Sequence, residues 1–313
     1  MQNFLLSFNV VFPIAVLMAL GFFIKKIKLV NEITVKQMNN IIFKVFLPTM
    51  LFKNVYESNI GEVFDPKLVI YSFTAVIISI VTPFILVPIF EKQNSKRGVM
   101  IQAMFRSNFV IFGIPITEAL CGSAGVGVAA ILIATVVPLF NFSAVIALEV
   151  FNGNKPDFKK ICKGIVTNPL IISSILGLLV NFVGLEFPTV IEKSISNVGS
   201  IATPLALIVL GASINFGTVS KNATRLLVGL SVKLVILPAA ALFIAAFVFG
   251  FRGAELSIMM SLFATPPAVS SFTMAQQMGG DSDLACQLVM FGTVASVITM
   301  FLWVFTFVSL GFI

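Results

Sequence analysis

The sequence predicts an all-α polytopic membrane protein with ten transmembrane helices, arranged as two inverted five-helix repeats. Of its 313 residues, 58% are hydrophobic and 11% are charged, whereas soluble proteins carry roughly 25% charged residues. Apolar runs of the length that crosses a bilayer, about 20 residues, follow one another along the chain. Two of these runs carry similar interruptions of small and polar residues. These three observations exclude a soluble globular protein.

Charged or turn-rich segments divide the chain into ten apolar runs. The first is expected to be a retained span, because no Lys or Arg precedes it and no A-x-A motif follows it. The longest polar segment, 151–163, is expected to be a cytoplasmic link between a first repeat, 1–150, and a second repeat, 164–313. We expect spans at 5–24, 37–56, 68–90, 98–120, 126–150, 164–184, 190–215, 224–249, 254–278 and 283–311.

The basic residues predict the orientation in the membrane. Short loops rich in Lys and Arg stay on the cytoplasmic side. Both termini are therefore expected outside a cytoplasmic (inner) membrane, and five spans per half make the second half inverted. The residues on the basic side are Lys25, Lys26, Lys28, Lys36, Lys92, Lys96, Arg97, Lys155, Lys159, Lys160, Lys163, Lys221 and Arg225.

Composition also narrows the function. The chain has no histidine, which removes imidazole metal ligands and general bases. It has no G-x-S-x-G motif, and its cysteines, Cys121, Cys162 and Cys286, form no C-x-x-C pair. We expect neither enzyme activity nor a metal or other cofactor. The net charge of +7 comes from short clusters between apolar runs, so a nucleic acid partner is not expected.

Two runs contain residues that interrupt a helix. Irregular backbone at membrane depth is tolerated only where protein buries it or water reaches it, so a cavity is expected. Thr265 is expected to cap a half-helix that starts at Pro266, and two half-helix N-termini near the midplane favour an anion. The candidate substrate-binding residues are Arg106, Ser107, Asn108, Gly113 and Pro115 in run 98–120, and Thr265, Pro266, Pro267, Ser270 and Ser271 in run 254–278.

Three basic residues stand more than a turn inside apolar runs: Lys44, Arg106 and Lys233. Arg106 lies about nine residues inside its run, where a charge costs about 2.5–3.5 kcal/mol on insertion scales. It is expected either to contact an anionic substrate or to serve the structure, by pairing with Glu118, by capping carbonyl groups or by snorkelling. Lys44 and Lys233 lie within about two turns of predicted cytoplasmic ends, and their long side chains are expected to snorkel.

A cation site is a further hypothesis. Glu118 lies near the outer end of its run, and together with Gln276 or Gln277 it would supply oxygen ligands for a coupling ion such as sodium. Proton coupling also stays open.

The interrupted runs resemble the auxin efflux carrier family. The resemblance rests on Asn108-Phe-Val-Ile-Phe-Gly113-Ile-Pro115, on Ala264-Thr-Pro266-Pro-Ala-Val-Ser-Ser-Phe-Thr-Met-Ala275-Gln276-Gln277, on Gly292-Thr293 and on Leu47-Pro48. It covers nearly the whole chain, and the short central link is similar to the bacterial malate or malonate permease branch.

That resemblance implies broken fourth and ninth helices that cross near the middle of the membrane. It also implies a scaffold of helices 1, 2, 6 and 7, a transport part of helices 3–5 and 8–10, a homodimer, and contact between Asn108 and a carboxylate substrate. The chain differs from the family pattern in its two adjacent prolines and in Arg106, which puts the identity of the substrate in doubt.

The leading hypothesis is a secondary transporter that moves a small organic anion, such as malate, malonate or an auxin-like acid, by alternating access. A sodium-coupled symporter of the bile-acid type is the alternative, and a passive channel is a weaker one. Membrane lipid is the other expected partner.

Overall fold

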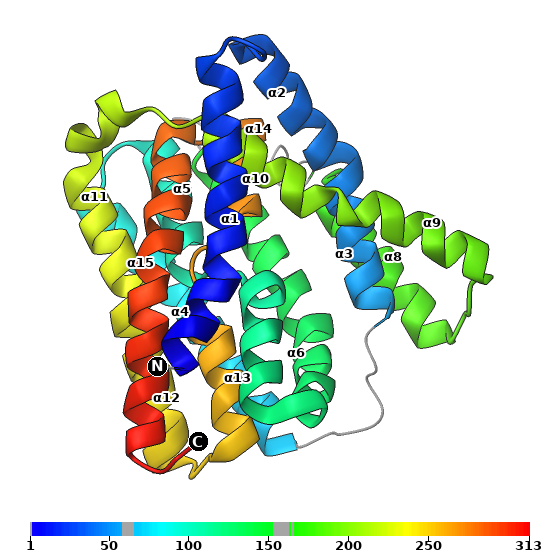
Figure 1. The fold of residues 1–313 in the computed structure, drawn as a ribbon, viewed down its shortest axis with the longest axis vertical. Helices are drawn as coiled ribbons and strands as arrows, with labels where there is room; N and C mark the ends of the chain where they lie inside the picture. Colours follow the sequence, from blue (N-terminus) through cyan, green and yellow to red (C-terminus); the bar gives the residue numbers. More distant parts are fainter. Residues whose placement is uncertain (1, 58–65, 153–162, 164–165) are drawn as a thin grey trace.

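The protein is helical throughout the part that the computed structural model describes, namely residues 2–57, 66–152, 163 and 166–313. Figure 1 shows long helices stacked side by side, with both chain ends in the lower half of the view. Within that part, β-structure is limited to an isolated bridge. The prediction of an all-α protein is confirmed.

The first half of the chain follows the predicted runs closely. Asn31 caps the helix that starts at Glu32: its Oδ1 atom accepts a 2.9 Å hydrogen bond from the Thr34 N–H. Π-helical turns (η) join several α-helices without a break. The elements are α1 (Gln2–Lys26), α2 (Glu32–Ile41), η1 (Ile42–Phe46), α3 (Leu47–Tyr56), α4 (Pro66–Phe90), α5 (Asn94–Phe105), η2 (Phe109–Gly113) and α6 (Ile114–Val150).

The second half has a similar sequence of elements. They are α8 (Pro169–Val183), α9 (Thr189–Ser200), α10 (Ala202–Ala212), the 3₁₀ turn η3 (Phe216–Thr218), α11 (Val219–Ser231), η4 (Val232–Ile236), α12 (Leu237–Phe243), η5 (Ile244–Val248), α13 (Gly253–Phe263), α14 (Ser270–Gln277) and α15 (Ser282–Ser309).

Helix α6 reverses direction within its length. Its residues are helical without a break from Ile114 to Val150, but its second half runs back along α5: Asn141 accepts a hydrogen bond from Arg106, and a Cβ on Gly98 would meet the Ala147 carbonyl oxygen. A straight helix rises 1.5 Å per residue and would place Asn141 far from Arg106. The separate spans predicted at 98–120 and 126–150 therefore stay a prediction.

Several helices have the length and composition that a membrane requires. Four described stretches are long and apolar enough to cross a bilayer: 66–90, 189–212, 216–248 and 282–309. Shorter apolar helices lie at 135–150, 169–183 and 253–263. The chain is therefore a polytopic membrane protein.

The contact between α1 and α10 depends on two glycines. A Cβ atom on Gly21 would lie 1.9 Å from the Ile208 carbonyl oxygen, and one on Gly211 would lie 1.9 Å from the Met18 carbonyl oxygen. Small residues at membrane helix interfaces let two backbones approach closely. The glycines thus set the distance between α1 and α10.

Ion pairs hold together the ends of helices that carry the basic clusters. Glu91, directly after α4, pairs with Arg225 of α11 and accepts a 2.8 Å bond from the Gln93 N–H. Lys96 of α5 lies 3.8 Å from Asp281, next to α15. The predicted basic side is therefore one end of the molecule, where α4, α5, α11 and α15 meet.

Glu91 is the most buried carboxylate of this group, with 5% of its side chain exposed. Burial alone would raise the pKa of Glu91, but the hydrogen bonds from Arg225 and the Gln93 N–H, with the charge of Arg225, lower it below the usual value. The folded protein therefore favours the ionised form of Glu91.

We expect Gly21→Ala to lower stability by about 1–3 kcal/mol, because the added carbon overpacks the α1–α10 contact. Thermal unfolding in detergent measures the change. Ala19→Val is the matched control, since Ala19 is exposed on the same helix. Equal unfolding temperatures for the two variants would contradict this account of α1–α10 packing.

We expect Glu91→Gln to lower stability at neutral pH by about 1.5–3 kcal/mol, the range for hydrogen bonds to charged groups. The pKa of Glu91 is lower in the folded than in the unfolded state, so its contribution is present above the unfolded pKa and is lost as the pH falls through the folded pKa. The difference in the free energy of unfolding between wild type and variant should therefore disappear at acidic pH. Glu57→Gln is the control, because Glu57 forms an exposed i, i+4 pair with Lys53, and it should leave stability nearly unchanged. A stability difference for Glu91→Gln that does not change with pH would contradict the pKa argument.

Candidate functional site

Two interrupted helices cross in the interior of the protein. Helix α5 ends at Phe105 and α13 ends at Phe263, and the chain continues in each case as a short non-helical segment. These segments, 106–108 and 264–269, are called the crossover below. The Asn108 N–H donates to the Pro266 carbonyl oxygen at 2.9 Å, and Ser107 pairs with Pro267 in an antiparallel bridge. The predicted interruptions are present, and they contact each other.

The second half-helix starts later than predicted. Thr265 is not a helix cap: α14 begins at Ser270, and its N-cap residue is Val269. The reason lies in the two prolines, because a proline disfavours helical backbone at the residue before it. Helical backbone is disfavoured in this way at both Thr265 and Pro266, and the Pro266 carbonyl oxygen accepts the bond from Asn108.

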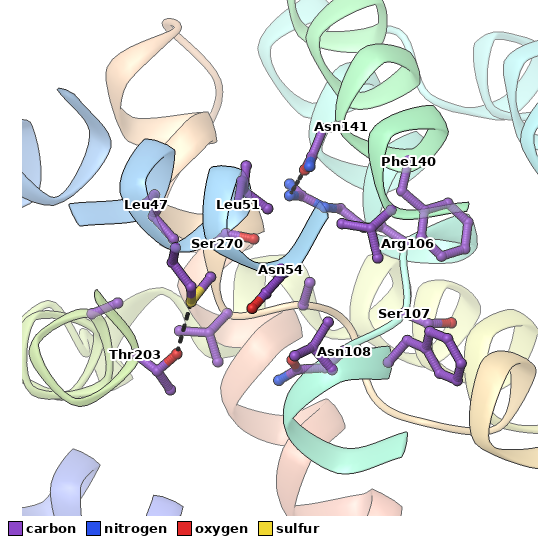
Figure 2. Close-up of a pocket in the computed structure, with 17 residues that line it drawn as sticks. Leu47, Leu51, Asn54, Arg106, Ser107, Asn108, Phe140, Asn141, Thr203 and Ser270 are labelled. Atoms are coloured by element: carbon purple, nitrogen blue, oxygen red, sulfur yellow. Dashed lines mark hydrogen bonds between the residues drawn. The ribbon is translucent and has the colours of Figure 1, made fainter. Parts of the chain in front are cut away.

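The crossover borders a small cavity, the crossover cavity, of about 60 Å³. A water molecule needs roughly 10–15 Å³ by this measure, so the cavity has room for a few waters or a small polar group. Figure 2 shows Asn54 from α3, Asn108 from the crossover and Ser270 from α14 facing this space, with Arg106 and Asn141 nearby. The lining residues described are Leu47, Met50, Leu51, Asn54, Arg106, Ser107, Asn108, Phe109, Val110, Val137, Phe140, Asn141, Thr203, Ala206, Ala268, Val269 and Ser270.

The cavity is rich in hydrogen-bond donors. Arg106 is its one charged residue among those described, and none of them is acidic. Within the described part, the side-chain amide nitrogens of Asn108 and Asn141 are buried and have no hydrogen-bond acceptor. Buried donors without a partner cost about 1–3 kcal/mol each, so the site favours an occupant that supplies acceptors.

Arg106 is buried beside the cavity. It is 4% exposed, and its guanidinium group donates to Asn141 Oδ1 (Figure 2). The guanidinium group also contacts the Met274 sulfur. Snorkelling to the surface is therefore wrong for Arg106. None of the acidic side chains that the structure describes pairs with it, so its charge is available to an anion in the cavity.

Helix ends add to this electrostatic field. Phe109 and Val110, at the start of η2, line the cavity together with Val269 and Ser270, at the start of α14. The first N–H groups of a helix carry a partial positive charge. Two helix starts at one cavity therefore favour negative charge in it.

Two further candidate residues, Gly113 and Ser271, contribute to the packing of the crossover and are not among the described residues that line the cavity. Gly113 lets η2 approach α13, since a Cβ there would lie 3.1 Å from the Ser261 carbonyl oxygen and 2.5 Å from the Phe109 ring. Ser271 is buried, and its carbonyl oxygen accepts a 3.0 Å bond from Gln102. Pro115 and Glu118 fall in α6, and their side chains lie outside the described part of the structure.

The residues of the cation hypothesis divide between two sides of the crossover. The start of α6 lies beside α13, where Thr117 donates to Ser261 Oγ at 2.8 Å. Helix α14 instead contacts α5 and leads toward the basic end. There Gln276 and Gln277 border an open cavity with Lys36 and Asn40. The structure thus groups the two glutamines with a lysine.

The prediction that Lys233 snorkels is wrong. Lys233 is fully buried, and its ammonium group donates to Ser107 Oγ and, at 3.2 Å, to the Phe263 carbonyl oxygen. Turn η4 passes directly behind the crossover, so the side chain finds acceptors inside the protein. Lys44, for which the same was predicted, is exposed.

Sequence reasoning also missed the contribution of other helices. Asn54, Asn141 and Thr203 line the cavity, although each stands in an apolar run away from the interruptions. A polar side chain in the middle of such a run was the available signal. Their convergence on one cavity depends on tertiary packing, which the spacing along the chain does not show.

Comparison with known proteins shows what this chain is similar to. A family model described as membrane transport protein matches residues 6–160 and 154–304. An uncharacterized transporter of Methanothermobacter thermautotrophicus is 26% identical over 310 residues, which cover 96% of this chain and 98% of that protein. An uncharacterized transporter of Methanocaldococcus jannaschii is 23% identical over 309 residues, again covering 96% of this chain and 98% of its own length. With a family match that extends over nearly all of its length, the chain belongs to the membrane transport protein family, the auxin efflux carrier family that its crossover motifs indicated.

Proposed function

We propose that the protein is a secondary transporter that carries a small organic anion through the membrane, with the crossover cavity as its binding site. One observation carries this proposal: a buried cavity holds Arg106 and two unpaired amide donors, and no described acidic residue lines it. Membership of a transporter family supports the general role.

A carboxylate fits the chemistry of this cavity. Its oxygens accept hydrogen bonds, which the amide nitrogens of Asn108 and Asn141 are free to donate. Arg106 and the two helix starts offset its negative charge. The volume of about 60 Å³ favours a small acid, such as malonate or malate, over a bulky one such as an auxin-like acid.

Alternating access requires two parts that move against each other. We infer a scaffold of α1, α2–α3, α8 and α9–α10, and a transport part that contains α4–α6 and α11–α15. The placement of the cavity supports this division, since α3 and α10 line one side of it and the crossover lines the other. Movement of the crossover against α3 and α10 would expose the cavity to each side of the membrane in turn.

The proposal includes the membrane arrangement that the sequence predicts: ten spans in two inverted repeats, both termini outside the cytoplasmic membrane, and a homodimer formed through the scaffold. The two matched segments of the family model, 6–160 and 154–304, meet at the predicted link 151–163, which supports the division into halves.

Sodium coupling is a second candidate, and one observation favours it. The amide oxygens of Asn39 and Gln102 are buried without a hydrogen-bond donor in the described part of the structure. Both side chains lie against α14, since their amide nitrogens donate to the carbonyl oxygens of Thr273 and Ser271. Oxygen atoms without donors are ligands that a hard cation prefers.

Ligand-induced thermal stabilisation tests the proposal, because a ligand that binds the folded state raises its apparent stability. The purified protein would be heated in detergent with malonate, malate or indole acetate, with sodium or with choline as the cation. We expect malonate or malate to stabilise the wild type. We expect Asn108→Ala to weaken binding about tenfold to a hundredfold, the loss of one or two hydrogen bonds to a charged group.

Asn197→Ala is the control, because Asn197 is exposed on α9, away from the cavity. Stabilisation by carboxylates in both variants alike would remove Asn108 from the site. A complete lack of stabilisation by carboxylates, with stabilisation by sodium alone, would refute the anion proposal and leave a cation-dependent carrier. Carboxylate binding that is unchanged when choline replaces sodium would remove the second candidate.

A further inference from the structure

Lys233 joins the two interrupted helices from behind the cavity. It stands in η4, within the apolar stretch 216–248, and no part of it reaches the surface. Its ammonium group donates to Ser107 Oγ in the first interruption and to the carbonyl oxygen of Phe263, the last residue of α13, before the second. One amine therefore contacts both interruptions.

Lys44 shows that this burial is not forced by the local sequence. Each of the two lysines stands in a π-helical turn that leads into a Leu-Pro pair, Leu47-Pro48 after Lys44 and Leu237-Pro238 after Lys233. Lys44 nevertheless extends to the surface. A buried charge in a membrane span costs about 2.5–3.5 kcal/mol on insertion scales, so the inward position of Lys233 requires a compensating role.

The bond to Phe263 supplies part of that compensation. The last carbonyl groups of a helix carry a partial negative charge and lack partners within the helix. Lys233 satisfies one such group at the end of α13. None of the described acidic residues forms an ion pair with Lys233, so Ser107 and Phe263 are the partners that the described structure gives its ammonium group.

The bond to Ser107 fixes the backbone beside the cavity. The Ser107 oxygen points away from Asn54, Asn108 and Ser270 (Figure 2), and it accepts the bond from Lys233. Ser107 stands between Arg106 and Asn108, which both line the crossover cavity. A bond that holds Ser107 in place therefore also holds its two neighbours.

We propose that Lys233 is a positioning residue for the transported anion: by bonding Ser107 Oγ and the Phe263 carbonyl oxygen it holds the two interruptions together, so that Arg106 and Asn108 keep their places at the cavity. This inference rests on the proposed function. It makes Lys233 act on the anion through Ser107.

A double-mutant cycle on malonate transport tests the inference. Wild type, Lys233→Gln, Ser107→Ala and the double variant would be reconstituted in liposomes, and the KM and maximal rate of malonate exchange measured. We expect each single variant to raise KM about tenfold. We expect the double variant to match Ser107→Ala within about twofold, because residues that act through one contact are not additive.

Lys44→Gln is the matched control, and it should leave KM unchanged. Lys233→Arg keeps the charge and should retain a lower KM than Lys233→Gln. Glutamine retains a hydrogen-bond donor, so thermal unfolding without malonate should show both Lys233 variants folded.

Several outcomes would overturn the inference. They are an unchanged KM in Lys233→Gln, a double variant whose KM is raised by the product of the two single effects, or loss of folded protein in both Lys233 variants, which would make Lys233 a folding residue. Failure of the proposed function looks different, since the wild type itself would then show no saturable malonate exchange.

Discussion

The structure depends on one constraint: backbone polar groups at membrane depth need partners inside the protein. Where α5 and α13 stop, N–H and C=O groups lose their helical partners, and lipid offers no replacement. The two interruptions satisfy each other, because the Asn108 N–H bonds the Pro266 carbonyl oxygen. Neither interruption is stable alone, so the crossing fixes the relative positions of four helical segments: α5, α6, α13 and α14.

The same constraint explains the character of the cavity. The backbone acceptors at the crossover are used, by Asn108 at Pro266 and by Lys233 at Phe263. What faces the cavity is therefore a surplus of donors, from side-chain amides, a hydroxyl group, a guanidinium group and two helix starts. A cavity of this kind selects an acceptor-rich, negatively charged occupant, and an occupant completes the hydrogen bonding that the protein leaves open.

The sequence predicts the local features well, since they depend on local chemistry. Pro266 and Pro267 cannot continue a helix, and Arg106-Ser107-Asn108 is too polar for a lipid-facing run, so both interruptions were predictable. The start of α14 was missed because two successive prolines disfavour helical backbone at Thr265 and Pro266.

Features that depend on tertiary packing were beyond the reach of sequence spacing. Asn141 contacts Arg106 although the two are 35 positions apart in the sequence, and Lys233 contacts Ser107 at a separation of 126 positions. The position of Lys233 along its apolar run suggested a short path to the surface, but the direction of its side chain is set by what lies beside η4. The position of a residue along a helix therefore predicts its depth in the membrane, but it does not predict which residues a charged side chain contacts.

The fixed charge of Arg106 has a consequence for the transport cycle that we propose. Arg106 moves with the protein, so a transport part that crosses empty carries its positive charge, whereas one that crosses with an anion carries that charge plus the negative charge of the cargo. Moving one elementary charge through 100 mV is worth about 2.3 kcal/mol. The membrane potential therefore acts differently on the return of the empty carrier and on the step with cargo. In a carrier built this way, the same buried cation that makes the cavity selective for an anion also makes the two halves of the cycle differ in their response to voltage.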